Sequence, residues 1–147
     1  MDINKWINHY RSMYIYGKTN TGKTTTILNI LKNEKYDYSY NCLQKIKNEK
    51  DFLELLINQN ILNMFTKKKH DYKLIVIDNI DYLNNCDKKI LNIIIKFLKN
   101  KNNIKKFNHI KYIFIGINNN DKKVLELKNV VEFNYEVKDL NHIDYDK

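Results

Sequence analysis

Two glycines, a lysine and a threonine in one short stretch place the strongest constraint on how this chain can fold. Gly17 and Gly22 enclose four residues, and Lys23 and Thr24 follow directly, which matches the pattern G-x-x-x-x-G-K-[ST] in full. That pattern works between a β-strand and an α-helix. The chain contains 3 glycines and no proline, so two glycines in one turn indicate a backbone geometry that other residues do not easily adopt.

Strand and helix patterns alternate around this turn. The runs "YKLIVID" and "KYIFIGI" are continuously apolar, as strands buried on both faces are. We expect strands over 12–16, 36–42, 72–78, 111–117 and 130–137, and helices over 3–10, 23–33, 49–65, 87–101 and 122–127. This alternation predicts a three-layer α/β fold, with a parallel sheet between two layers of helices.

The glycine turn has the chemistry of a phosphate-binding loop. Successive backbone N–H groups and the positive end of the helix can surround a polyphosphate, Lys23 can reach the β and γ phosphates, and the Thr24 hydroxyl can ligate Mg²⁺. Asn20 stands where many such loops place a third glycine, and asparagine tolerates left-handed backbone. We therefore expect ATP and Mg²⁺ as cofactors. The expected nucleotide-binding residues are Gly17, Lys18, Thr19, Asn20, Thr21, Gly22, Lys23, Thr24 and Thr25.

A second acidic group for the metal follows a buried strand. Asp78 ends the run "LIVID", so we expect Thr24 and Asp78 to be the metal ligands. Many P-loop ATPases place a glutamate next to polarise the attacking water, and this chain has Asn79 there. An amide cannot accept a proton, so hydrolysis should fall by about 10²–10⁴ and binding much less. Asp81 either replaces the glutamate through a shifted geometry or serves as a loop or helix-capping residue.

A third polar group follows another apolar strand. Asn118 stands at the tip of "YIFIGI", where it would lie beside the γ phosphate and position the attacking water. The competing interpretation is a polar turn in an asparagine-rich chain. The catalytic candidates are thus Lys23, Asp78 and Asn118.

The net charge has two interpretations. At +9, with a pI near 9.4, the chain could bind an anionic partner such as DNA. Lysine, asparagine and isoleucine are also the residues that AT-rich coding sequence over-supplies, so the lysines could simply be solvated. The basic clusters span 47–50, 66–70 and 99–106, each in a predicted loop or at a helix end.

Several features indicate a soluble intracellular protein of the nucleus or cytoplasm. Cys42 and Cys86 lack the spacing of a metal site, which favours free or buried thiols in a reducing compartment. No run approaches the length of a membrane span and the N-terminus does not resemble a signal peptide, so we expect no membrane partner. At 147 residues, residues 1–147 fit a single domain. The composition is compatible with a virus or a parasite.

In their order and spacing, these elements resemble the AAA+ class of P-loop ATPases. Residues 17–24 correspond to Walker A, residues 74–79 to Walker B and Asn118 to sensor 1. Within the class, "NKWINHY", "YDYSYNC" and "GINNNDKKVLELKNVVEFNY" are most similar to clamp loaders, particularly the large subunit of replication factor C. The resemblance implies a five-stranded parallel sheet of order 5-1-4-3-2, with adenine near residues 6–14.

The resemblance also implies a role and partners. Clamp loaders carry a helical lid and a second sensor after this core, and we expect this chain to lack a C-terminal lid. Its only arginine, Arg11, precedes the phosphate loop, so other AAA+ or clamp-loader subunits would supply an arginine finger. The implied function is an ATPase core in DNA replication with weak or partner-dependent hydrolysis. The alternatives are a non-catalytic, ATP-gated assembly module and a viral packaging or helicase ATPase.

Overall fold

The computed structural model describes residues 3–19, 21–57, 72–118 and 120–137. Five strands form one sheet in the order β2-β3-β4-β1-β5, and all neighbours are parallel. The strands are β1 (Ser12–Gly17), β2 (Asp37–Cys42), β3 (Lys73–Ile80), β4 (Ile110–Gly116) and β5 (Phe133–Val137). This confirms the predicted parallel sheet of order 5-1-4-3-2, which is the same order counted from the other edge.

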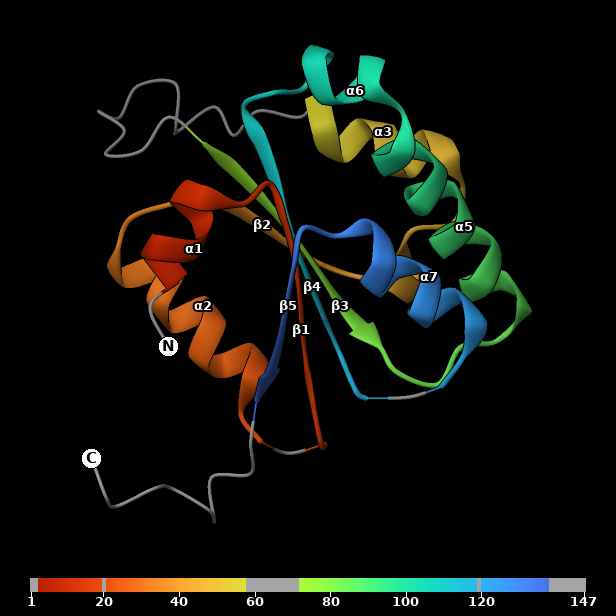
Figure 1. Cartoon of the computed structure of the whole chain (residues 1–147), viewed down its shortest axis with the longest axis horizontal. Coiled ribbons are helices and arrows are strands. Elements are labelled where there is room, and N and C mark those ends of the chain that lie inside the picture. Colours follow the sequence, from red (N-terminus) through yellow and green to blue (C-terminus); the bar gives the residue numbers. More distant parts are fainter. Residues whose placement is uncertain (1–2, 20, 58–71, 119, 138–147) are drawn as a thin grey trace.

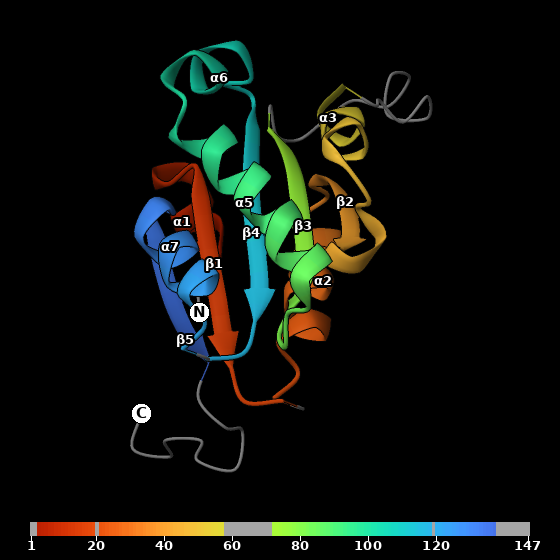
Figure 2. The ribbon, with the colours of Figure 1, turned by 90° about the vertical axis from the view of Figure 1, so that its right-hand side faces the viewer.

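Helices cover both faces of the sheet, which makes the predicted three layers (Figures 1 and 2). One face carries α1 (Ile3–His9) and α2 (Lys23–Asn33). The other face carries η1 (Leu43–Lys45), α3 (Glu49–Ile57), α5 (Asn85–Lys99) and α7 (Lys122–Val130), with α6 (Lys101–Lys106) after α5. Within the described ranges, none of these helices has both the length and the apolar character needed to span a lipid bilayer.

The central strands supply both halves of the core. Along β3, Leu74 and Val76 pack toward α1 and α2, whereas Ile75 and Ile77 pack toward α5. Every residue of β4 is buried. These strands are continuously apolar in sequence because both of their faces are covered.

Some helix boundaries differ from the sequence prediction. The helix predicted over 87–101 ends at Lys99, because Asn100 is extended (φ −82°, ψ 114°) and its side chain accepts a hydrogen bond from the Asn102 backbone, which starts α6. The basic cluster 99–106 is therefore mostly helical. The helix predicted over 49–65 begins at Glu49 and is described as far as Ile57.

Some predictions fall outside the described residues. They concern Asn20 of the phosphate loop, the remainder of the helix predicted to 65, the basic cluster 66–70 and the expected lack of a lid after residue 137.

Strand β3 continues beyond Asp78 through a β-bulge, and so is longer than the predicted strand over 72–78. Its pairing with β4 shifts between Ile77 and Ile80, and Asn79 between them adopts a left-handed backbone with φ 64°. An extra residue of this kind reverses the face on which the following side chains lie. Ile80 accordingly joins Ile75 and Ile77 in the same half of the core.

Gly116 allows the bulged end of β3 to approach β4 closely. A Cβ atom on Gly116 would lie 2.2 Å from the Ile80 carbonyl oxygen and 2.7 Å from the Tyr14 hydroxyl. The first of these neighbours is backbone, which cannot rotate away. Any side chain at this position must therefore push the two strand ends apart.

We expect Gly116→Ala to destabilise the protein by about 1–3 kcal/mol, the usual cost of overpacking a buried position. Urea unfolding measures this difference. Lys122→Ala, at an exposed position in the first turn of α7, is the control and should change the free energy of unfolding by no more than about 0.5 kcal/mol. Equal stability of the two variants would contradict the steric account of Gly116.

Candidate functional site

The phosphate loop and the acidic end of β3 meet at the carboxyl edge of the sheet. Since β1, β4 and β3 are parallel neighbours, the segments that follow them share this edge. Together they line a cavity of about 230 Å³. The lining residues are Thr19, Thr21, Gly22, Lys23, Thr24, Thr25, Asp78, Asn79, Asp81 and Ile117.

The loop is held by its own side chains. Gly22 adopts a left-handed backbone (φ 76°, ψ 19°) immediately before α2, a conformation that glycine takes without steric cost. The Thr21 hydroxyl donates to the Lys18 carbonyl oxygen at 2.9 Å. The Lys23 amine donates to the carbonyl oxygens of Gly17 and Lys18 at 3.1 and 2.8 Å. Lys23 therefore curls back over the loop at the start of α2.

Charges of both signs surround the Lys23 amine. Burial lowers the pKa of Lys23, while the neighbouring charges of Asp81 and Asp78 act to raise it. The two carboxylates thus stabilise the charged form of an amine that burial disfavours. A charged lysine at this position is what binding of a phosphate requires.

Asp78 is buried, and its carboxylate accepts several hydrogen bonds. The Thr24 hydroxyl donates to Oδ2 at 2.7 Å, the Tyr40 hydroxyl donates to the same oxygen, and the Asn79 backbone N–H donates to Oδ1 at 2.7 Å. The contact between Thr24 and Asp78 joins two oxygen ligands of the hard type that Mg²⁺ prefers. The residues predicted to hold the metal therefore lie together and fit that ion.

Tyr40 is a site residue that the sequence analysis missed. It lies on β2, whose pairing with β3 brings Cys42 opposite Asp78. Burial raises the pKa of Tyr40, and the hydrogen bond to Asp78 raises it further, so the phenol stays protonated and donates. The sequence carries no local signal for this contact, because it depends on the register between two strands that are far apart in the chain.

Asn118 follows β4 at the edge of the sheet where it was predicted, but its side chain has a hydrogen-bond partner that the sequence analysis did not predict. It is exposed beyond the end of β4, and its Oδ1 accepts a hydrogen bond from the Lys128 amine at 3.0 Å. The Lys128 amine also lies 4.1 Å from the centre of the Tyr16 ring. The side chain of Asn118 is thus bonded to α7, whereas its neighbour Ile117 lines the cavity.

Asp81 lies in the cavity and does not cap the following helix. The cap of α5 is Asn84, whose side chain accepts from the Asp87 backbone at 2.8 Å while the Asp87 carboxylate accepts from the Asn84 backbone at 3.2 Å. Asn79 also lines the cavity, and its carbonyl oxygen accepts from the Gln44 side chain at 3.1 Å. The helix-capping role considered for Asp81 is therefore filled by Asn84.

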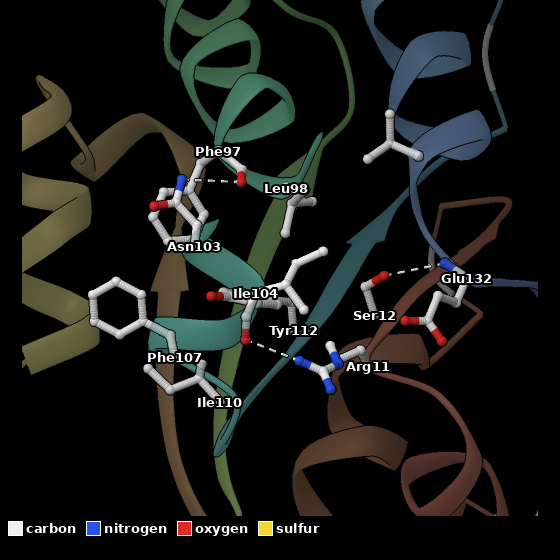
Figure 3. A pocket seen from close by; sticks show the side chains of 11 residues that line it. Arg11, Ser12, Phe97, Leu98, Asn103, Ile104, Phe107, Ile110, Tyr112 and Glu132 are labelled. Atoms are coloured by element: carbon white, nitrogen blue, oxygen red, sulfur yellow. Dashed lines mark hydrogen bonds between the residues drawn. The ribbon is translucent and has the colours of Figure 1, made fainter. Parts of the chain in front are cut away.

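A second cavity, of about 170 Å³, lies near the amino ends of β1 and β4 and is lined mainly by apolar side chains (Figure 3). Arg11 points across it and donates to the Ile104 carbonyl oxygen at 3.0 Å. Because the strands are parallel, this is the edge of the sheet opposite the phosphate loop. The chain's only arginine is therefore remote from its own nucleotide-binding loop.

A family model described as "ATPase family associated with various cellular activities (AAA)" matches residues 13–134. The chain belongs to the AAA family of ATPases. The matched span runs from β1 into β5 and includes the phosphate loop, Asp78 and Asn118. AAA ATPases generally bind ATP with Mg²⁺, which agrees with the residue types gathered in the larger of the two cavities just described.

The fold of this AAA domain is widely shared. The solved structures include 167 matching chains, whereas no curated protein sequence matches. A mutant of RuvB from Thermotoga maritima has a TM-score of 0.52 and 14% sequence identity, and the alignment covers 86% of this chain and 38% of the RuvB chain. Our chain therefore spans less than half of that protein, and at such low identity the likeness shows the fold alone.

Tyr40→Phe removes one donor to the Asp78 carboxylate. We expect the Mg²⁺-dependent part of ATP affinity to fall by about 10–100-fold, as is usual when a group that orients a metal ligand is lost. Titration with a fluorescent ATP analogue at several Mg²⁺ concentrations measures this effect. Tyr38→Phe, two residues earlier on β2 and packed against the core on the α1 and α2 side, is the control. Equal losses in both variants would argue against orientation of Asp78 by Tyr40.

Proposed function

We propose that this AAA-family chain binds ATP with Mg²⁺ at the phosphate loop and acts as a clamp-loader-like ATPase core in DNA replication. The main support is that Lys23, Thr24 and Asp78 line one cavity, with the Thr24 hydroxyl 2.7 Å from the Asp78 carboxylate. We further propose that residues 1–147 form one nucleotide-binding domain, since strands from β1 to β5 share one sheet.

In this proposal the loop holds the phosphates and the strand end holds the metal. The backbone N–H groups of residues 17–25 and the start of α2 face the phosphate oxygens. Lys23 exchanges its loop carbonyl partners for the β and γ phosphates. Thr24 and Asp78 hold Mg²⁺, which when bound neutralises charge on the β and γ phosphate oxygens.

Three features favour slow or partner-dependent hydrolysis. Asn79 stands where a glutamate would polarise water, and the Asn118 side chain is bonded to Lys128. Arg11 is bonded to Ile104 at the opposite edge of the sheet. A second AAA+ subunit would therefore have to present an arginine at this site, and Asn118 would have to leave Lys128 to contact the γ phosphate.

These same features favour one alternative, a non-catalytic module that assembles with other replication proteins when ATP is bound. In that case ATP would act as a ligand that stabilises one conformation, and its hydrolysis would be dispensable. Single-turnover measurements on the isolated chain separate the two functions, because the alternative predicts bound ATP that is not converted to ADP.

Lys23→Ala tests nucleotide binding. We expect affinity for a fluorescent ATP analogue to fall by about 10–150-fold, because a hydrogen bond to a charged group contributes about 1.5–3 kcal/mol. The measurement is an equilibrium titration with Mg²⁺ present. Retention of wild-type affinity would refute the proposed binding site.

Lys18→Ala is the matched control for that experiment, since it removes the same charge from the same loop. Lys18 is exposed and contributes its backbone carbonyl to the loop, which the substitution keeps. We expect at most about fivefold weaker binding, consistent with the 0–1 kcal/mol typical of exposed charges. Equal losses at positions 18 and 23 would indicate a general effect of loop charge.

DNA binding is the second testable part of the proposal. The lysines of α6 are exposed, and the chain carries a net charge of +9. Binding of a labelled duplex should weaken as salt rises, with the logarithm of the association constant falling by about 0.9 per phosphate neutralised for each unit of log[salt]. The double variant Lys105→Ala, Lys106→Ala should reduce that slope by about 2, or about one per lysine.

The control for DNA binding is the double variant Lys32→Ala, Lys35→Ala. Its exposed lysines lie in the last turn of α2 and in the turn that follows it, on the other face of the sheet. Its salt slope should equal that of the wild type. An equal reduction in both double variants would indicate net charge rather than a surface on α6. No duplex binding at low salt would exclude this part of the proposal.

A further inference from the structure

The cavity at the phosphate loop contains a carboxylate, Asp81, to which the proposed function gives no part in hydrolysis. Among the described residues that line it, the acidic ones are Asp78 and Asp81. Asp78 is engaged by the hydroxyls of Thr24 and Tyr40 on one oxygen and by the Asn79 backbone on the other. Asp81 is therefore the other described carboxylate that faces the space where the phosphates would lie.

The β-bulge explains how Asp81 comes to lie there. Asp78 follows Leu74 and Val76 in the alternation of β3, toward the side of the sheet that carries α2. In a regular strand, a residue three positions later faces the opposite side. The extra residue Asn79 (φ 64°) places Ile80 in the core beneath α5, and Asp81 therefore returns to the face of Asp78.

Backbone contacts hold this arrangement. The Ile80 carbonyl oxygen accepts from the Ile117 backbone at 3.4 Å, and Gly116 leaves room for that close approach. The Ile117 backbone also forms a hydrogen bond with the Asp81 carboxylate. Asp81 is thus anchored to the end of β4, the strand that lies between β3 and the strand preceding the phosphate loop.

The surroundings make this carboxylate a stronger base than one in water. Burial raises the pKa of Asp81, and the nearby charge of Asp78 raises it further. The charge of Lys23 and the hydrogen bond from Ile117 oppose this rise. General bases are tuned in this direction by burial and neighbouring charge.

We propose that Asp81 is the general base for ATP hydrolysis in this chain. It takes the role of the glutamate that many P-loop ATPases have at the position of Asn79. The inference rests on the proposed function. The Asp81 carboxylate accepts a proton from a water molecule as the water oxygen bonds to the γ phosphorus. The bond between that phosphorus and the β–γ bridging oxygen breaks, and its electron pair leaves with ADP. The proton then passes from Asp81 to the released phosphate.

Single-turnover hydrolysis of ATP, with the full chain in excess over nucleotide and Mg²⁺ present, tests the assignment. Asp81→Asn should lower the rate by about 10²–10⁴, the contribution of a general base. It should change affinity for a fluorescent ATP analogue by far less than it changes the rate, because the charge of Asp78 beside Lys23 remains. Asp81→Glu should retain part of the rate. Hydrolysis by Asp81→Asn at the wild-type rate would overturn the inference.

Glu54→Gln is the matched control, since Glu54 is an exposed carboxylate on α3 that does not line this cavity. It should keep the wild-type rate within a few-fold. Asn79→Glu should raise the rate only slightly, because a base is already present. A large rise in Asn79→Glu, with no loss in Asp81→Asn, would assign the missing base to position 79 instead.

A stability measurement distinguishes loss of chemistry from loss of folding. A folded-state pKa that is raised means that ionised Asp81 destabilises the fold above that pKa. Asp81→Asn should therefore unfold at the same temperature as the wild type or higher at pH 7, and the difference should shrink as pH falls. An unfolding temperature below that of the wild type would contradict the environment described for Asp81.

The outcome for the wild type separates this inference from the proposed function. If the wild type does not bind the ATP analogue, the proposed function fails, and the inference fails with it. If the wild type binds ATP but gives no ADP in a single turnover, the inference fails, the ATP-binding part of the proposed function stands, and the non-catalytic alternative is favoured. If the wild type gives ADP and Asp81→Asn gives it at the same rate, only the inference fails.

Discussion

Parallel pairing of three buried strands is the constraint on which the rest of this structure depends. Strands β3, β4 and β1 lie side by side in the sheet and are covered on both faces, so their backbone groups must bond to one another. Parallel neighbours require crossover helices, which return the chain to the same starting edge. All strand ends therefore meet at one edge, and this edge gathers the phosphate loop, Asp78 and Asp81 in one cavity.

Bringing these charged groups into one partly buried cavity costs electrostatic free energy. Burial lowers the pKa of Lys23 and raises that of Asp81, so each group is less readily charged than in water. Their mutual attraction offsets part of this cost, and hydroxyl donors from Thr24 and Tyr40 satisfy Asp78. Charged groups held in this way are typical of sites that bind ligands or carry out chemistry, where stability is given up for function.

Membership of the AAA family limits the chemistry that this chain can carry out more than it limits its biological role. The fold is shared with 167 chains of solved structures, and one fold can host many functions. In the site of this chain, Asn79 follows Asp78, a β-bulge returns Asp81 to the cavity, and Lys128 is bonded to Asn118. These features bear on whether ATP would be hydrolysed or only held.

The sequence by itself determined the features that depend on neighbours along the chain. The glycine turn, the buried run ending in Asp78 and the strand-helix alternation are local patterns, and the structure contains each of them. Tertiary structure alone decided the contacts of Tyr40, the partner of Asn118 and the direction of Asp81. Each of these depends on strand register, on helix packing or on an extra residue in β3. The distances between these side chains are set only when segments that are remote in the sequence pair with one another.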